Sequence, residues 1–120
     1  MKCADAETGG RIDRQFISGI TKLIILGKIR KTGTHPYEIY KEIKDHPFAP
    51  IRGISKSDVY NTIKALETMG LISGKPGLVG SKMQKKYHLT KQGAEVSGRA
   101  KKILSAHLND IKRLIAYEFK

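Results

Sequence analysis

Cysteine is almost absent from this sequence, because Cys3 is the only one among 120 residues. A single cysteine excludes a disulfide within the chain and fits a reducing compartment. Long apolar runs are missing too, since no stretch approaches the roughly 20 consecutive apolar residues that a membrane-spanning helix requires. The N-terminus also lacks the apolar core of a secretory signal peptide. We therefore expect a cytoplasmic protein with no membrane partner.

Acidic residues are scarce: Asp and Glu number 11 against 23 Lys and Arg, which gives a net charge of +12. Such an excess indicates nucleic acid or an anionic membrane surface as the partner. Half of it lies in residues 52–91, where eight Lys or Arg stand with two acids. No acidic residue occurs between Glu67 and Glu95. The basic surface is therefore concentrated in one third of the chain.

Patterns typical of enzymes and metal sites are also missing. The histidines lie far apart without ligand-type spacing, at His35, His46, His88 and His107. The glycines at 74, 77 and 80 fit turns rather than a phosphate loop, because Gly80-Ser81-Lys82 reverses the required Lys-Ser order. No nucleophile elbow or catalytic carboxylate pair is visible. We predict no enzyme activity, no bound metal and no cofactor.

The segment from Ser55 to Gly70 has the clearest pattern, that of an amphipathic helix of about four turns. Ser55-Lys56-Ser57-Asp58 has the form of a capping box, which satisfies free backbone N–H groups at a helix start. Gly70 supplies the left-handed residue that commonly closes a helix. The apolar residues at helical spacing predict the buried face: Val59, Ile63, Leu66 and Met69.

The opposite face of this helix carries Lys56, Ser57, Tyr60, Asn61 and Lys64. Lysines can contact phosphates, and an asparagine amide can pair bidentately with adenine in the major groove. We interpret this face as one that contacts DNA. Two alternatives are open, because a tyrosine at position 60 can equally be half-buried packing and Asn61 can simply be solvated.

The next segment has the pattern of a β-hairpin, or wing. Residues 71–75 and 85–90 are the expected strands, with turn-forming residues at 76–81 between them. Alternation places Tyr87 and Leu89 inward, and Lys86 and His88 outward. Five lysines in the acid-free stretch, at 75, 82, 85, 86 and 91, favour an anionic partner, the alternative being an ordinary solvated basic surface.

The N-terminal part predicts a loose tail and two helices. The first helix starts near Asp13 and ends before Thr32-Gly33, with the apolar residues Phe16, Ile17, Ile20, Leu23, Ile24 and Ile29. This wide apolar face can serve both the core and a partner chain. The second helix starts at Thr34-His35-Pro36, stops near His46-Pro47 and buries Tyr37, Ile39, Tyr40 and Ile43. Residues 48–53 are expected to be an irregular connection.

The C-terminal part predicts one helix from the Thr90 cap to about Tyr117, which Gly93 and Gly98 weaken in its first turns. The apolar spacing 104, 108, 111, 115 is that of a short coiled-coil seam. We expect a homodimer through this helix, whose candidate contacts are Ile103, Leu104, Leu108, Ile111, Leu114 and Ile115. The alternative is that the seam packs within the chain.

The predicted order is helix, helix, helix, strand, strand, helix. The expected fold class is therefore mainly α with a small β-hairpin, a winged helix-turn-helix plus a C-terminal dimerisation helix. The expected divisions are a flexible N-terminal tail at 1–11, a winged-helix DNA-binding domain at 12–92, and the dimerisation helix at 93–120.

Several short strings resemble the PadR family of winged-helix transcriptional regulators. They are Tyr37-Glu38-Ile39-Tyr40, Val59-Tyr60, Leu66-Glu67, Gly70-Leu71-Ile72, and Lys86-Tyr87-His88-Leu89-Thr90 followed by Gly93. The resemblance implies a homodimer in which the last helix packs on the first helix of the partner. It also implies binding to a palindromic operator, usually as a repressor, with Tyr60, its exposed neighbours and the wing residues Lys82, Lys85 and Lys86 as DNA contacts.

The predicted function is that of a sequence-specific DNA-binding transcriptional regulator, a homodimeric PadR-like repressor on double-stranded DNA. Two alternatives are open: a nonspecific architectural DNA-binding protein, and a winged-helix protein-interaction module that docks an acidic partner. A small-molecule effector is also open, because nothing in the sequence identifies a pocket for one.

Overall fold

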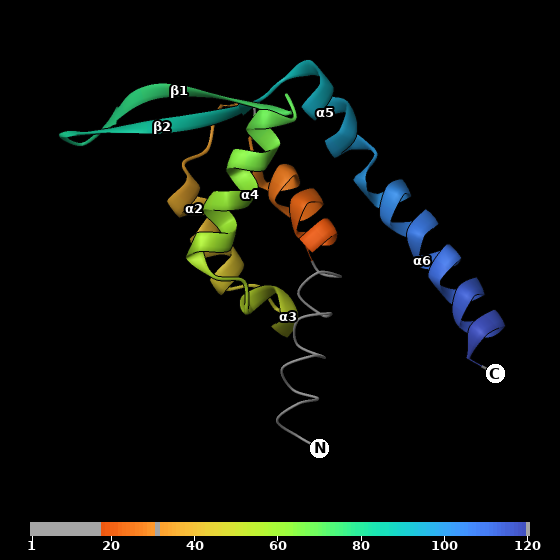
Figure 1. The fold of residues 1–120 in the computed structure, drawn as a ribbon. Helices are drawn as coiled ribbons and strands as arrows, with labels where there is room; N and C mark the ends of the chain where they lie inside the picture. Colours follow the sequence, from red (N-terminus) through yellow and green to blue (C-terminus); the bar gives the residue numbers. More distant parts are fainter. Residues whose placement is uncertain (1–17, 31, 120) are drawn as a thin grey trace.

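The computed structural model describes residues 18–30 and 32–119. The expected tail, the helix start near Asp13, and Phe16 and Ile17 lie outside these ranges. Residues 18–28 are helical, and they are followed by α2 (Pro36–Lys44), α3 (Ala49–Arg52), α4 (Lys56–Thr68), β1 (Ile72–Val79), β2 (Lys82–Leu89), α5 (Lys91–Gly98) and α6 (Ala100–Glu118). This mainly helical chain with one antiparallel hairpin confirms the predicted winged-helix fold (Figure 1).

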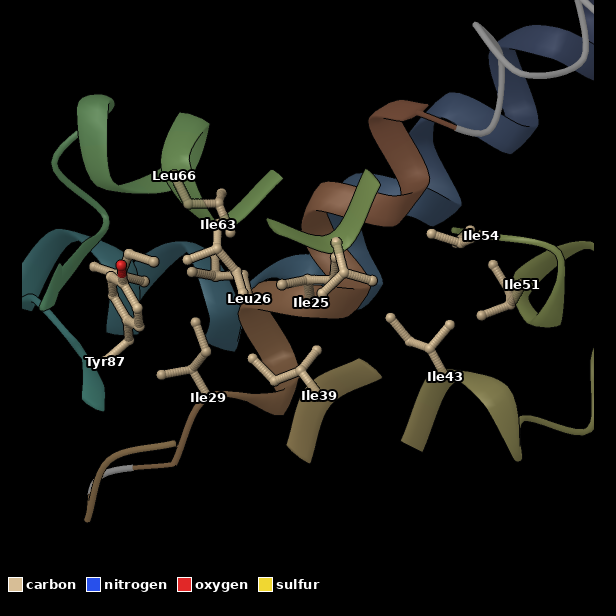
Figure 2. Packing of buried hydrophobic residues seen from close by; sticks show 12 residues of the cluster. Ile25, Leu26, Ile29, Ile39, Ile43, Ile51, Ile54, Ile63, Leu66 and Tyr87 are labelled. Atoms are coloured by element: carbon tan, nitrogen blue, oxygen red, sulfur yellow. The ribbon is translucent and has the colours of Figure 1, made fainter. Parts of the chain in front are cut away.

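The hydrophobic core lies where the first helix meets α2 and α4 under the base of the hairpin. Ile25 and Leu26 are almost fully buried in its middle, with Tyr87 at one end and Ile51 and Ile54 at the other (Figure 2). The prediction for this helix named Ile24, which is only partly buried. The run Leu23-Ile24-Ile25-Leu26 is apolar on every side, so helical periodicity did not identify the inward face.

Helix α2 begins where the sequence predicts and buries Ile39 and Ile43 completely. Its first turn is closed by the Glu38 carboxylate, which accepts a hydrogen bond of 3.1 Å from the His35 backbone N–H. The prediction that Tyr37 is buried is wrong, because its side chain is 52% exposed. Tyr40 is partly buried against the core. Ile39 and Ile43 fill the part of the core that α2 faces, so the two tyrosines lie at the edge of the core.

The connection between α2 and α4 is more regular than predicted, because it contains the short helix α3. Ile51 from α3 is buried in the core. Arg52 Nη1 donates hydrogen bonds of 2.9 Å to the carbonyl oxygens of both His46 and Pro47. The Arg52 guanidinium therefore links the end of α3 to the start of the connection and satisfies two exposed carbonyl groups with charge-assisted hydrogen bonds.

Helix α4 confirms the capping box. Asp58 N donates to Ser55 Oγ at 3.1 Å, and Ser55 N donates to Asp58 Oδ2 at 3.3 Å. Gly70 has the predicted left-handed backbone, with φ of +78°. The predicted inward residues Val59, Ile63 and Leu66 are buried, whereas Met69 is 58% exposed. Met69 follows the last helical residue, so the chain has already turned away from the core at that point.

The hairpin is longer and its turn is tighter than predicted. The register runs from Ile72 opposite Leu89 to Val79 opposite Lys82, which leaves only Gly80 and Ser81 in the turn. Gly80 has φ of +64°, as a two-residue hairpin turn requires. Pro76, expected in the turn, pairs with Lys85 in the ladder. Proline is tolerated there because both strands of a two-stranded sheet are edges.

The base of the hairpin is tied to the segment before α2. Thr34 N donates to Tyr87 O and Tyr87 N donates to Thr34 O, both at 2.9 Å. Tyr87 is buried and Leu89 is partly buried, as predicted. His88 is on the face opposite Tyr87, as alternation predicts, but it is half-buried rather than open to solvent. Its ring lies against Gly33, and its Nδ1 has no hydrogen-bond partner among the described residues. Gly33, with φ of +97°, leaves the space that this ring occupies.

The junction from β2 to α5 is a compact set of contacts around Thr90. Thr90 Oγ1 donates to Gly70 O at 2.7 Å and accepts from Gly93 N at 3.1 Å, while Thr90 N donates to Leu71 O at 3.0 Å. Gly93 is buried directly against the Leu71 carbonyl, and a β-carbon there would overlap that group. The Thr-x-x-Gly string therefore has a structural explanation, since it joins the end of α4 to the start of α5.

The predicted single C-terminal helix is in fact two helices, α5 and α6, separated at Arg99. Gly98 favours a break at this position, because glycine is among the weakest helix formers. Val96 in α5 packs against the core, whereas no residue of α6 is buried. The break allows α6 to leave the rest of the chain, as Figure 1 shows.

We predict that Gly93→Ala lowers the free energy of unfolding by about 1–3 kcal/mol or more, because the new methyl group forces α5 away from Leu71. Urea unfolding followed by circular dichroism measures the change. Gly98→Ala is the matched control in the same helix, since nothing lies within 4 Å of a β-carbon there. Equal effects of the two substitutions would contradict this account.

Candidate nucleic-acid interface

The outer face of α4 carries the five residues that the sequence predicts for it. Because Val59, Ile63 and Leu66 face the core, the opposite side turns to solvent. The residues exposed there are Lys56, Ser57, Tyr60, Asn61 and Lys64. Tyr60 is 42% exposed, so its ring is available at the surface rather than enclosed in the core. The structure brings these residues together on one helix.

Helix α2 adds an aromatic side chain that the sequence interpretation placed in the core. Lys56 Nζ lies 5.5 Å from the centre of the Tyr37 ring and 5.8 Å from the centre of the Tyr60 ring. Each distance is within the range of a cation–π interaction. Lys56 therefore bridges the exposed faces of α2 and α4, and Tyr37 belongs to the same surface.

The surface continues along α2. The Tyr37 and Tyr40 ring centres are 6.3 Å apart, Lys41 Nζ is 5.7 Å from the Tyr37 ring, and Lys44 Nζ is 5.4 Å from the Tyr40 ring. We call this set the tyrosine–lysine surface, made of Tyr37, Tyr40, Lys41, Lys44, Lys56 and Tyr60. A sequence signal for it exists, because each lysine is four residues from a tyrosine: 37 and 41, 40 and 44, 56 and 60.

The acidic side chains of α2 pair with residues outside the tyrosine–lysine surface and do not form ion pairs with its lysines. Glu42 pairs with Arg30 at 3.1 Å and with Lys28 at 3.8 Å, and Glu38 lies 4.0 Å from Arg30. The Asp58 carboxylate is held at the start of α4 by the Ser55 backbone. Within residues 18–30 and 32–119, no ion pair involves a lysine of the tyrosine–lysine surface. Its positive charge is therefore available to an external anion.

The three predicted wing lysines do not share one face. In β2, alternation puts Lys82 and Lys86 on one side and Lys85 on the other. Lys82 and Lys85 are exposed, whereas Lys86 is half-buried with its Cγ against Gly33. The structure therefore gives the wing positive charge on both faces rather than a single basic side.

The wing and α2 are linked near this surface. Besides the paired bonds between Thr34 and Tyr87, His35 Nδ1 lies 3.2 Å from the Lys85 carbonyl oxygen. Arg30 N also donates to Thr34 Oγ1 at 2.9 Å. The start of α2, which carries Tyr37, is therefore fixed relative to the strand that carries Lys85.

The proposed dimer residues all lie on α6. Leu108, Leu114 and Ile115 are more than half exposed, and Ile103, Leu104 and Ile111 are half-buried. The described part of a single chain leaves this apolar stripe largely uncovered.

No cluster of three or more His, Cys, Asp or Glu side chains suited to a metal ion occurs in the described ranges. None of the helices in those ranges has the length and apolar character needed to cross a membrane.

A family model, the transcriptional regulator PadR-like family, matches residues 25–99. A PadR family transcriptional regulator from Eggerthella lenta has a similar structure, with a TM-score of 0.74, 20% identity and 98% of each chain covered. A PadR-like regulator from Bacillus cereus gives 0.65 at 22% identity, covering 87% of this chain and 99% of that one.

The Bacillus subtilis PadR structure is a complex with operator DNA, and it matches with a TM-score of 0.54 at 28% identity. The match covers 66% of this chain and 44% of that one. No curated protein is significantly similar in sequence. The family model, however, spans more than half of the 120 residues and runs from the first helix through α5. The chain is therefore not an enzyme but belongs to the PadR-like family of transcriptional regulators.

Proposed function

We propose that the protein is a homodimeric, sequence-specific DNA-binding repressor that acts in the cytoplasm. The observation that carries this proposal is the exposed face of α4, which joins the tyrosine–lysine surface through Lys56. The complex of Bacillus subtilis PadR with operator DNA supports it, because a relative of the same fold binds DNA.

In this proposal α4 lies in the major groove, which is about 12 Å wide and admits an α-helix. Ser57 and Asn61 are near the start of the helix and are exposed, so they can reach base edges. Lys56 and Lys64 contact phosphates and supply sequence-independent affinity through counterion release. Sequence choice and affinity therefore come from different side chains of one helix.

Tyr37 and Tyr60 position Lys56 for this role. A free lysine side chain loses up to about 2 kcal/mol of rotamer entropy when it is fixed. The two rings already restrict the ammonium group, and their hydroxyl groups can donate to phosphate oxygens. Lys56 and the hydroxyl groups of Tyr37 and Tyr60 therefore place one cation and two hydrogen-bond donors on one surface before DNA binds.

Homodimerisation through α6 follows from its uncovered apolar stripe. A helix with exposed leucine and isoleucine side chains gains stability by burying them against another chain. A two-fold axis would then place two copies of α4 on half-sites about 34–36 Å apart, or a multiple of this distance. Such a dimer on a promoter would block transcription by occupancy.

The test of the proposal is fluorescence anisotropy with a labelled duplex from the region upstream of the gene, and a shuffled duplex as the control. Each duplex is titrated at several salt concentrations. A specific regulator should prefer the native duplex by roughly a thousandfold or more. Equal, salt-sensitive binding to both would indicate an architectural protein. No binding to either at low salt would reject DNA as the partner.

Lys64→Ala should weaken binding to all duplexes about equally and reduce the slope of log K against log salt by about one unit, because one phosphate contact is lost. Anisotropy over a salt series measures the slope. Lys102→Ala removes the same charge from α6 and serves as the control. A slope that stays at the wild-type value would show that Lys64 does not contact phosphate.

Tyr37→Leu should weaken DNA binding roughly two- to fivefold, because Lys56 without the Tyr37 ring loses more rotamer freedom, up to about 1 kcal/mol, when it is fixed on DNA. Its effect on unfolding should be small because the side chain is half exposed. Tyr37→Phe keeps the ring and separates its contribution from that of the hydroxyl. If Tyr37→Leu binds as tightly as the wild type, the ring does not position Lys56.

Leu108→Glu should produce monomers, because it places a charge in the proposed apolar interface. Light scattering at micromolar concentration measures the mass. Asn109→Glu introduces the same side chain at the next position of α6 and should leave the dimer intact. A dimer that persists in Leu108→Glu would place the interface elsewhere.

A further inference from the structure

The tip of the wing carries a pair of large apolar side chains in open solvent. Leu78 is 72% exposed and Met83 is 69% exposed. The two residues lie directly opposite each other in the register of the hairpin. Such a pair projects from the same face of the sheet, with side chains close enough to touch. It therefore forms one small apolar knob at the end of the wing.

This knob extends a face that begins in the core. Two-residue alternation puts Leu78 and Met83 on the same side as Ile72, Tyr87 and Leu89. At the base of the hairpin these residues pack under the helices. Toward the tip the strands pass beyond the helices, as Figure 1 shows, and the face loses its cover. The exposed pair is therefore no part of the fold's own core.

The charges around the knob indicate what can cover it. Lys82 stands next to Met83, Lys85 lies two residues further on the same face, and Lys75 is on the opposite strand. The acid-free stretch from 68 to 94 includes the whole hairpin. An apolar knob with Lys85 on its own face and Lys75 and Lys82 on the opposite face suits a partner that is negatively charged outside and apolar inside. Stacked bases between two phosphate backbones have this arrangement.

We propose that Leu78 and Met83 insert into the minor groove beside the site of α4 and wedge apart one base step. This proposal rests on the DNA-binding function above and adds residues that act on DNA shape. An undeformed minor groove is only about 6 Å wide, whereas the backbones of two paired strands are already about 4.8 Å apart before side chains are added. The wing tip therefore enters only where the groove opens, as it does at a kink toward the major groove.

Insertion makes the wing sensitive to sequence without a hydrogen bond to a base. Pyrimidine–purine steps such as TA and CA unstack easily, whereas A-tracts are stiff and have a narrow minor groove. The wild-type protein should therefore bend its DNA by about 20° or more. It should also prefer a duplex with TA steps over an A-tract duplex by about fivefold or more.

The experiment compares the wild type with the double variant L78S/M83S. Bending is measured by energy transfer between dyes at the two ends of a duplex of ~30 base pairs from the upstream region. Step preference is measured by competition between a TA-rich and an A-tract duplex of equal length. Lys82→Ala, at the same hairpin tip, is the control that removes charge instead of apolar surface.

The double variant should lose the bend and the step preference while keeping the salt slope. Lys82→Ala should reduce the salt slope and keep the bend. Both changes affect exposed side chains, and circular dichroism with a melting curve verifies the fold. The single variants Leu78→Ala and Met83→Ala repeat the test with smaller changes if the double variant unfolds.

The outcomes separate this proposal from the one on which it rests. DNA binding by the wild type without a bend, or a bend that the double variant retains, would overturn the wedge and leave the regulator proposal intact. Binding of the wild type to anionic phospholipid vesicles that depends on Leu78 and Met83, with no DNA bend, would also overturn it. No binding to any duplex at low salt would overturn both.

Discussion

Two backbone hydrogen bonds between Thr34 and Tyr87 join the wing to the segment that begins α2. They connect residues that are far apart in sequence, and they do so beside a buried tyrosine ring that also lies against Gly74. A two-stranded hairpin is marginally stable alone, so the wing depends on this attachment and on the Thr90 junction. The same attachment sets the direction of the wing relative to Tyr37 and α4, and therefore the shape of the surface that we propose as the DNA interface.

Patterns with a local cause were predictable from the sequence. The Ser55 cap, the left-handed Gly70 and the start of α2 depend on residues within a few positions of one another, and each is confirmed. Features that depend on contacts between residues far apart in the sequence were not predictable. Helical spacing predicts that Tyr37 faces the core, yet Ile39 and Ile43 fill that space and Tyr37 is exposed. Likewise, the His88 ring is half-buried because Gly33, more than fifty residues earlier, leaves space for it.

The candidate interface shows the same division. Lys56, Ser57, Tyr60, Asn61 and Lys64 were predictable because one helix and one buried stripe determine which residues face outward. The contribution of α2 to the candidate interface was not predictable, because it depends on how α2 and α4 pack against each other. The distribution of charge also depends on contacts between helices: Arg30 and Lys28 pair with Glu38 and Glu42, and no lysine of the tyrosine–lysine surface has an ion-pair partner among the described residues.

The contacts around Thr90 affect how a genetic screen of this protein should be interpreted. Thr90 and its neighbours lie in sequence beside the wing, and their loss would abolish function as completely as the loss of a proposed DNA contact. Thr90 nevertheless acts inside the molecule, through Gly70, Leu71 and Gly93. A map of loss-of-function positions would therefore include scaffold residues together with residues of the candidate interface. Cellular protein abundance, measured for each variant, separates the two groups, because scaffold variants are degraded while variants of the candidate interface keep the fold and accumulate.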